Sequence, residues 1–132
     1  MQLSLDYDER SNVLYASFGP PRPAIGDALD GDDSVILRYE ESSGRMVGFT
    51  LVGIARGGPA GLRAPLIRGD VRREDQGIGR DTPWLELRMM PGAVLEIALQ
   101  GSARKLRVPV STVGGGASTE VELDALFAGA AR

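Results

Sequence analysis

The chain has 132 residues and a formal net charge of −3, from 18 acidic and 15 basic side chains. That length fits one domain with one cooperative core. The absence of cysteine and histidine excludes a disulfide framework, a thiolate or imidazole metal site, a Cys-His pair and a Ser-His-Asp triad. Side-chain chemistry is therefore limited to carboxylates, hydroxyls, guanidinium groups and one lysine amine.

No segment of the sequence predicts a membrane association. Residues 1–11 alternate polar and apolar side chains and carry acids, unlike the basic and apolar segments of a signal peptide. No apolar run approaches the ~20 residues that a membrane helix needs. We therefore expect a cytoplasmic protein with no membrane partner.

Charge is unevenly distributed along the chain. Residues 1–55 carry nine acids and four arginines, whereas residues 56–110 carry six acids and ten basic residues. Oppositely charged segments attract each other, either within one molecule or between partners. The simpler interpretation is that the two segments lie close together in one domain.

Alternation with a period of two residues predicts strands near the N-terminus. Apolar side chains alternate with polar ones in residues 3–7 and 13–15, and residues 8–12 supply a turn. Three prolines within residues 19–23 predict a stiff extended loop, because each fixes φ and removes a backbone donor.

A short edge strand and a hairpin are expected next. The edge strand is predicted at residues 24–29, and the hairpin strands at 34–40 and 45–53, joined across residues 42–44. Two inner rows should form the core, namely Val35, Leu37 and Tyr39 on one strand and Val47, Phe49 and Leu51 on the other.

The first 55 residues resemble a known bacterial family. The likeness rests on four segments, Leu5-Asp6-Tyr7-Asp8, Val13-Leu14-Tyr15, Val35-Ile36-Leu37-Arg38-Tyr39 and Val47-Gly48-Phe49-Thr50-Leu51-Val52. Together they resemble the domain of unknown function 2283 family, although its closing strand typically reads Gly-Ile-Glu-Ile-Leu. The resemblance implies a β-meander and assigns no catalytic residue.

Residues 56–83 break the alternation. Glycine, proline and arginine dominate this segment, and a patternless stretch of this length inside a compact domain is commonly functional or disordered. We expect a mobile loop with a short ordered piece near residues 66–68.

A second β-meander is predicted at residues 84–110, with strands at 84–89, 93–99 and 104–110 and a type II turn at Pro91-Gly92. Thr119 and Glu122 have the spacing of a helix capping box, so a short C-terminal helix is expected at residues 118–130. The fold class is thus mostly β, with two antiparallel meanders forming a small sandwich or open barrel.

Acidic residues offer the only metal and catalytic candidates. The run Asp27, Asp30, Asp32 and Asp33 supplies the oxygens that hard cations prefer, but its spacing does not match an EF-hand loop. A solvated acidic turn that blunts a strand edge is the better interpretation, so no metal or cofactor is expected. Asp6 and Asp8 could act as an acid-base pair, but turn capping is favoured for them.

The chain therefore predicts a non-catalytic binding or interaction module that self-associates or binds another protein. An alternative is an enzyme or binding protein for a small anion, with the 56–83 loop as a lid and arginines as clamps. A weak nucleic-acid binder is the second alternative, and acids in the loop argue against it. The residues expected to contact a partner or ligand are Arg68, Arg72, Arg73, Arg80 and Trp84.

Overall fold

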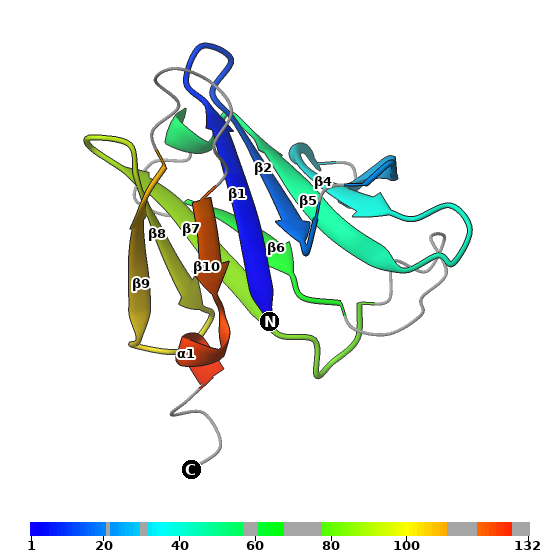
Figure 1. Ribbon diagram of the computed structural model, residues 1–132. Helices are drawn as coiled ribbons and strands as arrows, with labels where there is room; N and C mark the ends of the chain where they lie inside the picture. Colours follow the sequence, from blue (N-terminus) through cyan, green and yellow to red (C-terminus); the bar gives the residue numbers. More distant parts are fainter. Residues whose placement is uncertain (21, 30–31, 57–60, 68–77, 111–118, 128–132) are drawn as a thin grey trace.

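The protein folds into two antiparallel β-sheets (Figure 1). The computed structural model describes residues 1–20, 22–29, 32–56, 61–67, 78–110 and 119–127. The larger sheet has the strand order β10-β1-β2-β5-β4-β3 and the smaller one β6-β7-β8-β9. The larger sheet comprises β1 (Gln2–Asp8), β2 (Val13–Phe18), β3 (Ile25–Leu29), β4 (Asp32–Tyr39), β5 (Met46–Val52) and β10 (Thr119–Glu122). The smaller comprises β6 (Leu62–Pro65), β7 (Trp84–Met90), β8 (Val94–Leu99) and β9 (Lys105–Pro109).

The two predicted antiparallel sheets are confirmed, and they cover each other. The smaller sheet is a meander, whereas in the larger one β2 pairs with β5 and not with β3. Alternate residues of each strand point to one face, and the inner rows of the two sheets meet in one hydrophobic core. In β4, for example, Val35, Leu37 and Tyr39 are buried in this core, as expected. Leu85 and Leu87 of β7 enter the same core from the other sheet. The fold is therefore two sheets over a shared core, and it is not a closed barrel.

Turns require backbone conformations that glycine and asparagine tolerate. Gly92, in the predicted turn after β7, has a φ of 81°, as the third residue of a type II turn requires. Asn12 has a φ of 56° between β1 and β2. Its Oδ1 accepts hydrogen bonds from Tyr7 Oη and from the Ala55 amide, both at 3.0 Å. Asn12 thus ties this turn to η1 (Ile54–Arg56), the short 3-10 helix after β5.

The segment 56–83 contains a strand that its sequence does not predict. Strand β6 pairs with β7 in the register Leu62↔Leu87 and Ala64↔Leu85. Its four residues are too few to show alternation, but the neighbouring strand satisfies their backbone groups. Residues 57–60 and 68–77 lie outside the described residues.

The predicted helix at 118–130 is partly wrong. Thr119–Glu122 forms strand β10, which pairs with β1 in the register Leu3↔Val121, and the helix α1 spans only Asp124–Phe127. The capping-box spacing also fits a strand whose Val121 faces the core and whose neighbours face solvent. These residues form a strand and not a helix because their backbone pairs with the free edge of β1. Residues 118 and 128–130 lie outside the described residues.

The prediction that Val47 belongs to the inner row is also wrong. The pairing of β4 with β5 shifts between Arg38↔Gly48 and Tyr39↔Met46, which marks a β-bulge. Met46 takes the place in the core, whereas Val47 is buried outside it and lines a cavity on the opposite face of the sheet. A one-residue insertion reverses the face of every residue beyond it.

No helix within the described ranges is long and apolar enough to cross a membrane.

Candidate functional site

The outer face of the six-stranded sheet carries the candidate site. Strand register places two rows of residues across β1, β2, β5 and β4 on this face. The first row runs Ser4, Ser17, Gly48 and Arg38, and the second runs Asp6, Tyr15, Thr50 and Ile36. Directly opposed residues have Cβ atoms about 5 Å apart, so neighbouring side chains of each row lie within reach of one ligand.

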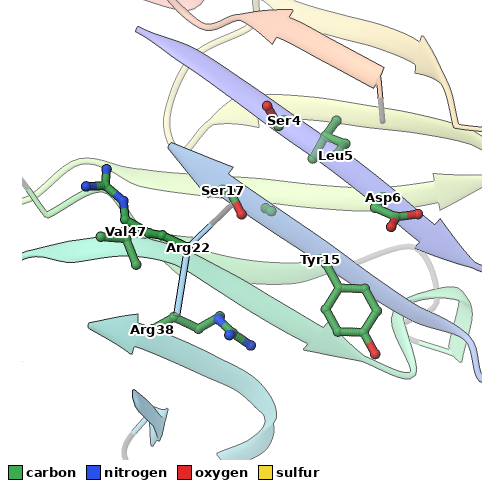
Figure 2. A pocket seen from close by; sticks show the side chains of 9 residues that line it. Ser4, Leu5, Asp6, Tyr15, Ser17, Arg22, Arg38 and Val47 are labelled. Atoms are coloured by element: carbon green, nitrogen blue, oxygen red, sulfur yellow. The ribbon is translucent and has the colours of Figure 1, made fainter. Parts of the chain in front are cut away.

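A cavity of about 400 Å³ lies over these rows. Its walls are the outward side chains of β1, β2 and β4, the bulge residue Val47 and Arg22 from the β2–β3 loop (Figure 2). The lining residues are Ser4, Leu5, Asp6, Tyr15, Ala16, Ser17, Arg22, Arg38 and Val47. Such a volume suits a small molecule.

Gly48 stands between Ser17 and Arg38 in the first row and brings no side chain to it. A Cβ built on it would overlap the Ala16 carbonyl oxygen and lie 3.1 Å from Ser17 Cα. The backbones of β2 and β5 therefore approach too closely for any other residue. The missing side chain keeps open the space between Ser17 and Arg38, which stand on either side of Gly48 in the row.

Most polar side chains that line this cavity are not engaged by other residues in the part of the chain that the structure describes. Among the described residues, the side chains of Ser4, Asp6, Tyr15, Ser17 and Arg38 form no hydrogen bond or ion pair. Arg38 is half-buried, and Figure 2 shows its guanidinium extended over the sheet in the direction of the Tyr15 ring. A partly buried cation without a counter-ion is costly. A ligand that brings an anionic group to Arg38 would remove that cost.

Arg22, the second arginine of the cavity, is already paired. Its Nη1 lies 3.2 Å from Glu40 Oε2. Glu40 also accepts a hydrogen bond of 2.8 Å from Ser43 Oγ. This hydrogen bond, followed by the charge of Arg22, holds the pKa of the Glu40 carboxyl below its usual value. Glu40 thus fixes Arg22 at the rim, and Arg38 is the cation available to a ligand.

The predicted contact residues are not brought together here. Arg68, Arg72 and Arg73 lie outside the described residues. Arg80 is exposed in the turn before β7, and Trp84 is half-buried at the start of that strand. Neither lines the cavity, and no described residue of 56–83 does so. The predicted lid therefore has no described part at this site.

The acidic candidates have structural roles where the structure describes them. Asp8 Oδ1 accepts hydrogen bonds from the Arg10 amide at 3.0 Å and the Ser11 amide at 3.4 Å. Hydrogen bonding with Ser11 lowers the pKa of the Asp8 carboxyl. Turn capping is thus confirmed for Asp8, whereas Asp6 faces the cavity.

For the acidic run, residue 30 and the side chain of residue 32 are outside the described set. Within that set, no three acidic side chains are close enough to hold a metal ion.

One buried hydroxyl on this face is unsatisfied. Thr50 is only 5% exposed, and its Oγ1 has no hydrogen-bond partner among the described residues. An unmade hydrogen bond of this kind costs about 1–3 kcal/mol. Thr50 stands directly opposite Tyr15, so the middle of this face holds polar groups that the fold itself does not need.

Apart from Asp6, sequence reasoning missed the cavity residues, although they carried a weak signal. The outward positions of β1 and β2 hold Ser4, Asp6, Tyr15 and Ser17, all polar, and such positions are ordinarily polar simply because they face solvent. Arg38 joins them only because β5 and β4 lie next to β2 in the sheet. Nothing in the local sequence fixes that order.

Comparisons of the chain with family models, curated proteins and solved structures found no match.

Proposed function

We propose that this protein is a non-catalytic binding module whose outer-sheet cavity takes a small anionic ligand. The observation that carries the proposal is a set of five polar side chains around one cavity of about 400 Å³ that have no partner among the described residues, with half-buried Arg38 among them. Arginine is suited to this role because its guanidinium binds carboxylate and phosphate through two parallel hydrogen bonds.

The remaining groups define what else the ligand carries. Asp6 accepts hydrogen bonds and disfavours a second anion near β1, so a hydroxyl or amine is expected at that end of the ligand. Ser4 and Ser17 donate or accept between the two ends, and the Tyr15 ring, 43% exposed, offers a flat apolar surface. A hydroxylated acid or a sugar phosphate has this distribution of charge and polarity.

A binding role fits these residues better than catalysis. The cavity holds one carboxylate, Asp6, and the chain has no histidine or cysteine to act with it as a base or nucleophile. Arg38, Ser4 and Ser17 can orient a ligand by hydrogen bonding. Asp6 alone supplies no paired acid and base.

Protein-observed NMR tests this proposal. A ¹⁵N-labelled sample is titrated with a panel of hydroxy acids, dicarboxylates and sugar phosphates, and shifts are followed at Ser4, Ser17 and the Arg38 Nε–H. We expect at least one compound to shift these signals together, and Arg38→Gln to weaken its binding tenfold or more.

Arg45→Gln is the matched control, since Arg45 is exposed in the β4–β5 turn and does not line the cavity. Equal affinity of Arg38→Gln and the native protein for a bound compound would contradict the proposal. So would a panel that leaves these three signals unchanged.

Self-association stays a prediction. Two edge strands carry features that oppose dimerisation by strand pairing. Edge strand β3 carries Asp27 in the inward row, opposite Leu37, and has a bulge after Ala28. Edge strand β9 carries Lys105 and Pro109. Inward charges, bulges, lysine and proline all oppose pairing between exposed edges. Pairing at these two edges is therefore disfavoured, and native mass spectrometry measures whether the protein dimerises through another surface.

A further inference from the structure

The outer face of the four-stranded sheet is basic. Leucines at positions 85 and 87 face the core, so the residues between them face outward. The charged and aromatic side chains on this face are Arg63 of β6, Trp84, Glu86 and Arg88 of β7, Glu96 of β8, and Lys105 and Arg107 of β9. Four cations and two carboxylates leave an excess of two positive charges on this face, although the whole chain has a net charge of −3.

Three of the cations surround one buried carboxylate. Glu96 Oε1 lies 3.0 Å from Arg88 Nη2 and 3.6 Å from Lys105 Nζ, and Oε2 lies 3.2 Å from Arg107 Nε. Burial by itself would raise the pKa of the Glu96 carboxyl, but the Arg107 hydrogen bond and the three positive charges together lower it. One ionised carboxylate therefore holds three cations side by side across β7, β8 and β9.

The charge on these cations is not balanced within the cluster. The side chain of Glu96 is 6% exposed, whereas those of Lys105 and Arg107 are 49% and 64% exposed. Their charged ends thus remain open to an external anion. Cations clustered in this way favour a polyanion, because its phosphates relieve their mutual repulsion and release counter-ions.

A flat stacking surface adjoins the cations. The Arg63 guanidinium lies over the Trp84 ring, 5.5 Å from its centroid, and its Nη1 donates a hydrogen bond of 3.4 Å to Gln100 Oε1. Arg63 is exposed. Guanidinium planes and aromatic rings are the surfaces on which unpaired bases stack.

We propose that this face binds single-stranded nucleic acid, with Arg88, Lys105 and Arg107 on phosphates and a base stacked on the Arg63–Trp84 pair. An acidic protein would bind the cations through its carboxylates, but it has no base to stack on the Arg63–Trp84 pair. A duplex has no unstacked base, and the described part of this face presents no helix or ribbon to enter its groove. The face lies across the core from the anion cavity, so the two proposals stand independently.

The chain's single tryptophan makes the test local. Trp84 is the only tryptophan of the chain, so its fluorescence reports on this face alone. We expect a 20-residue oligothymidylate to quench it and, when labelled, to gain anisotropy on binding. Three phosphate contacts on a single strand predict that log K falls with log salt with a slope of about −2.

Charge-removing variants make the test specific. We expect the double variant Lys105→Gln with Arg107→Gln to bind at least tenfold more weakly at low salt, with a salt slope reduced by about 1.4. Lys105→Gln alone removes only the longest contact to Glu96 and should lose part of the affinity with the fold intact by circular dichroism. Arg10→Gln, in the β1–β2 turn, removes the same charge elsewhere.

Three results would overturn the proposal. The first is oligothymidylate that changes neither Trp84 fluorescence nor anisotropy. The second is an equal loss of affinity in Arg10→Gln and Lys105→Gln, each of which removes one positive charge. The third is a polyglutamate peptide that binds as tightly as the oligonucleotide, which would assign the face to an acidic protein partner.

Discussion

The substitution Gly48→Ala tests the close approach of β2 and β5 beneath the candidate site. The added Cβ would overlap the Ala16 carbonyl oxygen and would lie 3.1 Å from Ser17 Cα and 3.2 Å from Ala16 C. All three atoms belong to the backbone, so no side-chain rotation relieves the overlap. The strands must separate instead, which weakens the ladder around the pair Ser17↔Gly48.

The size of the effect follows from the bonds that are disturbed. Two weakened backbone hydrogen bonds lose about 1 kcal/mol each, and strain in a packed region adds about 1–3 kcal/mol. Alanine also lowers the conformational entropy of the unfolded chain relative to glycine, which offsets less than about 1 kcal/mol of this loss of stability. We therefore expect Gly48→Ala to lower the free energy of unfolding by about 3 kcal/mol, a large part of the total for a domain of this size.

Gly26→Ala is the matched control. Gly26 stands on the other side of Arg38 in the same outer row, and a Cβ there meets only the Ile36 Cγ2 methyl, at 2.9 Å. A rotation of Ile36 about χ1 can relieve this contact without moving the backbone, so the loss should be smaller than for Gly48→Ala, about 1 kcal/mol. Urea unfolding followed by the fluorescence of Trp84 measures both variants. Equal stability of the two variants would refute the described approach of β2 to β5.

Two further predictions concern single side chains. Burial, followed by the charge of Asp27, raises the pKa of Tyr39 to about 12. Because the unfolded phenol ionises near pH 10, stability should fall as the pH rises above about 10, by about 3 kcal/mol in total once the pH passes 12. Urea unfolding of the native protein and Tyr39→Phe between pH 8 and 11.5 measures this, and parallel pH profiles would contradict it. Thr50→Val should raise the free energy of unfolding by about 1 kcal/mol, because the hydroxyl it removes is buried with no hydrogen-bond partner among the described residues. A loss of stability in this variant would mean that the hydroxyl is hydrogen-bonded in solution.

Local alternation was sufficient to predict most strands. In β1, β4 and β7, apolar residues recur at every second position, and one face of each strand is buried in the core. The turn at Gly92 was equally local, because a positive φ selects glycine there. The resemblance of residues 1–55 to a known family stays a prediction.

Tertiary pairing overrode the local pattern at three places. Residues Thr119–Glu122 became a strand because the edge of β1 was free to pair with them. Leu62–Pro65 became a strand because β7 lies beside it. Val47 left the core because the bulge in the β4–β5 pair reversed its face.

The sequence by itself determined the mostly β fold class, most of the strands and the chemistry that is excluded, since composition and alternation are properties of short segments. Only the tertiary structure decided where the candidate sites lie. Arg38 lies across β5 from Ser17, and Arg88, Lys105 and Arg107 meet around Glu96, because strands distant in the sequence are neighbours in a sheet. Such pairing depends on non-local hydrogen bonds and packing of whole faces, which no local pattern encodes.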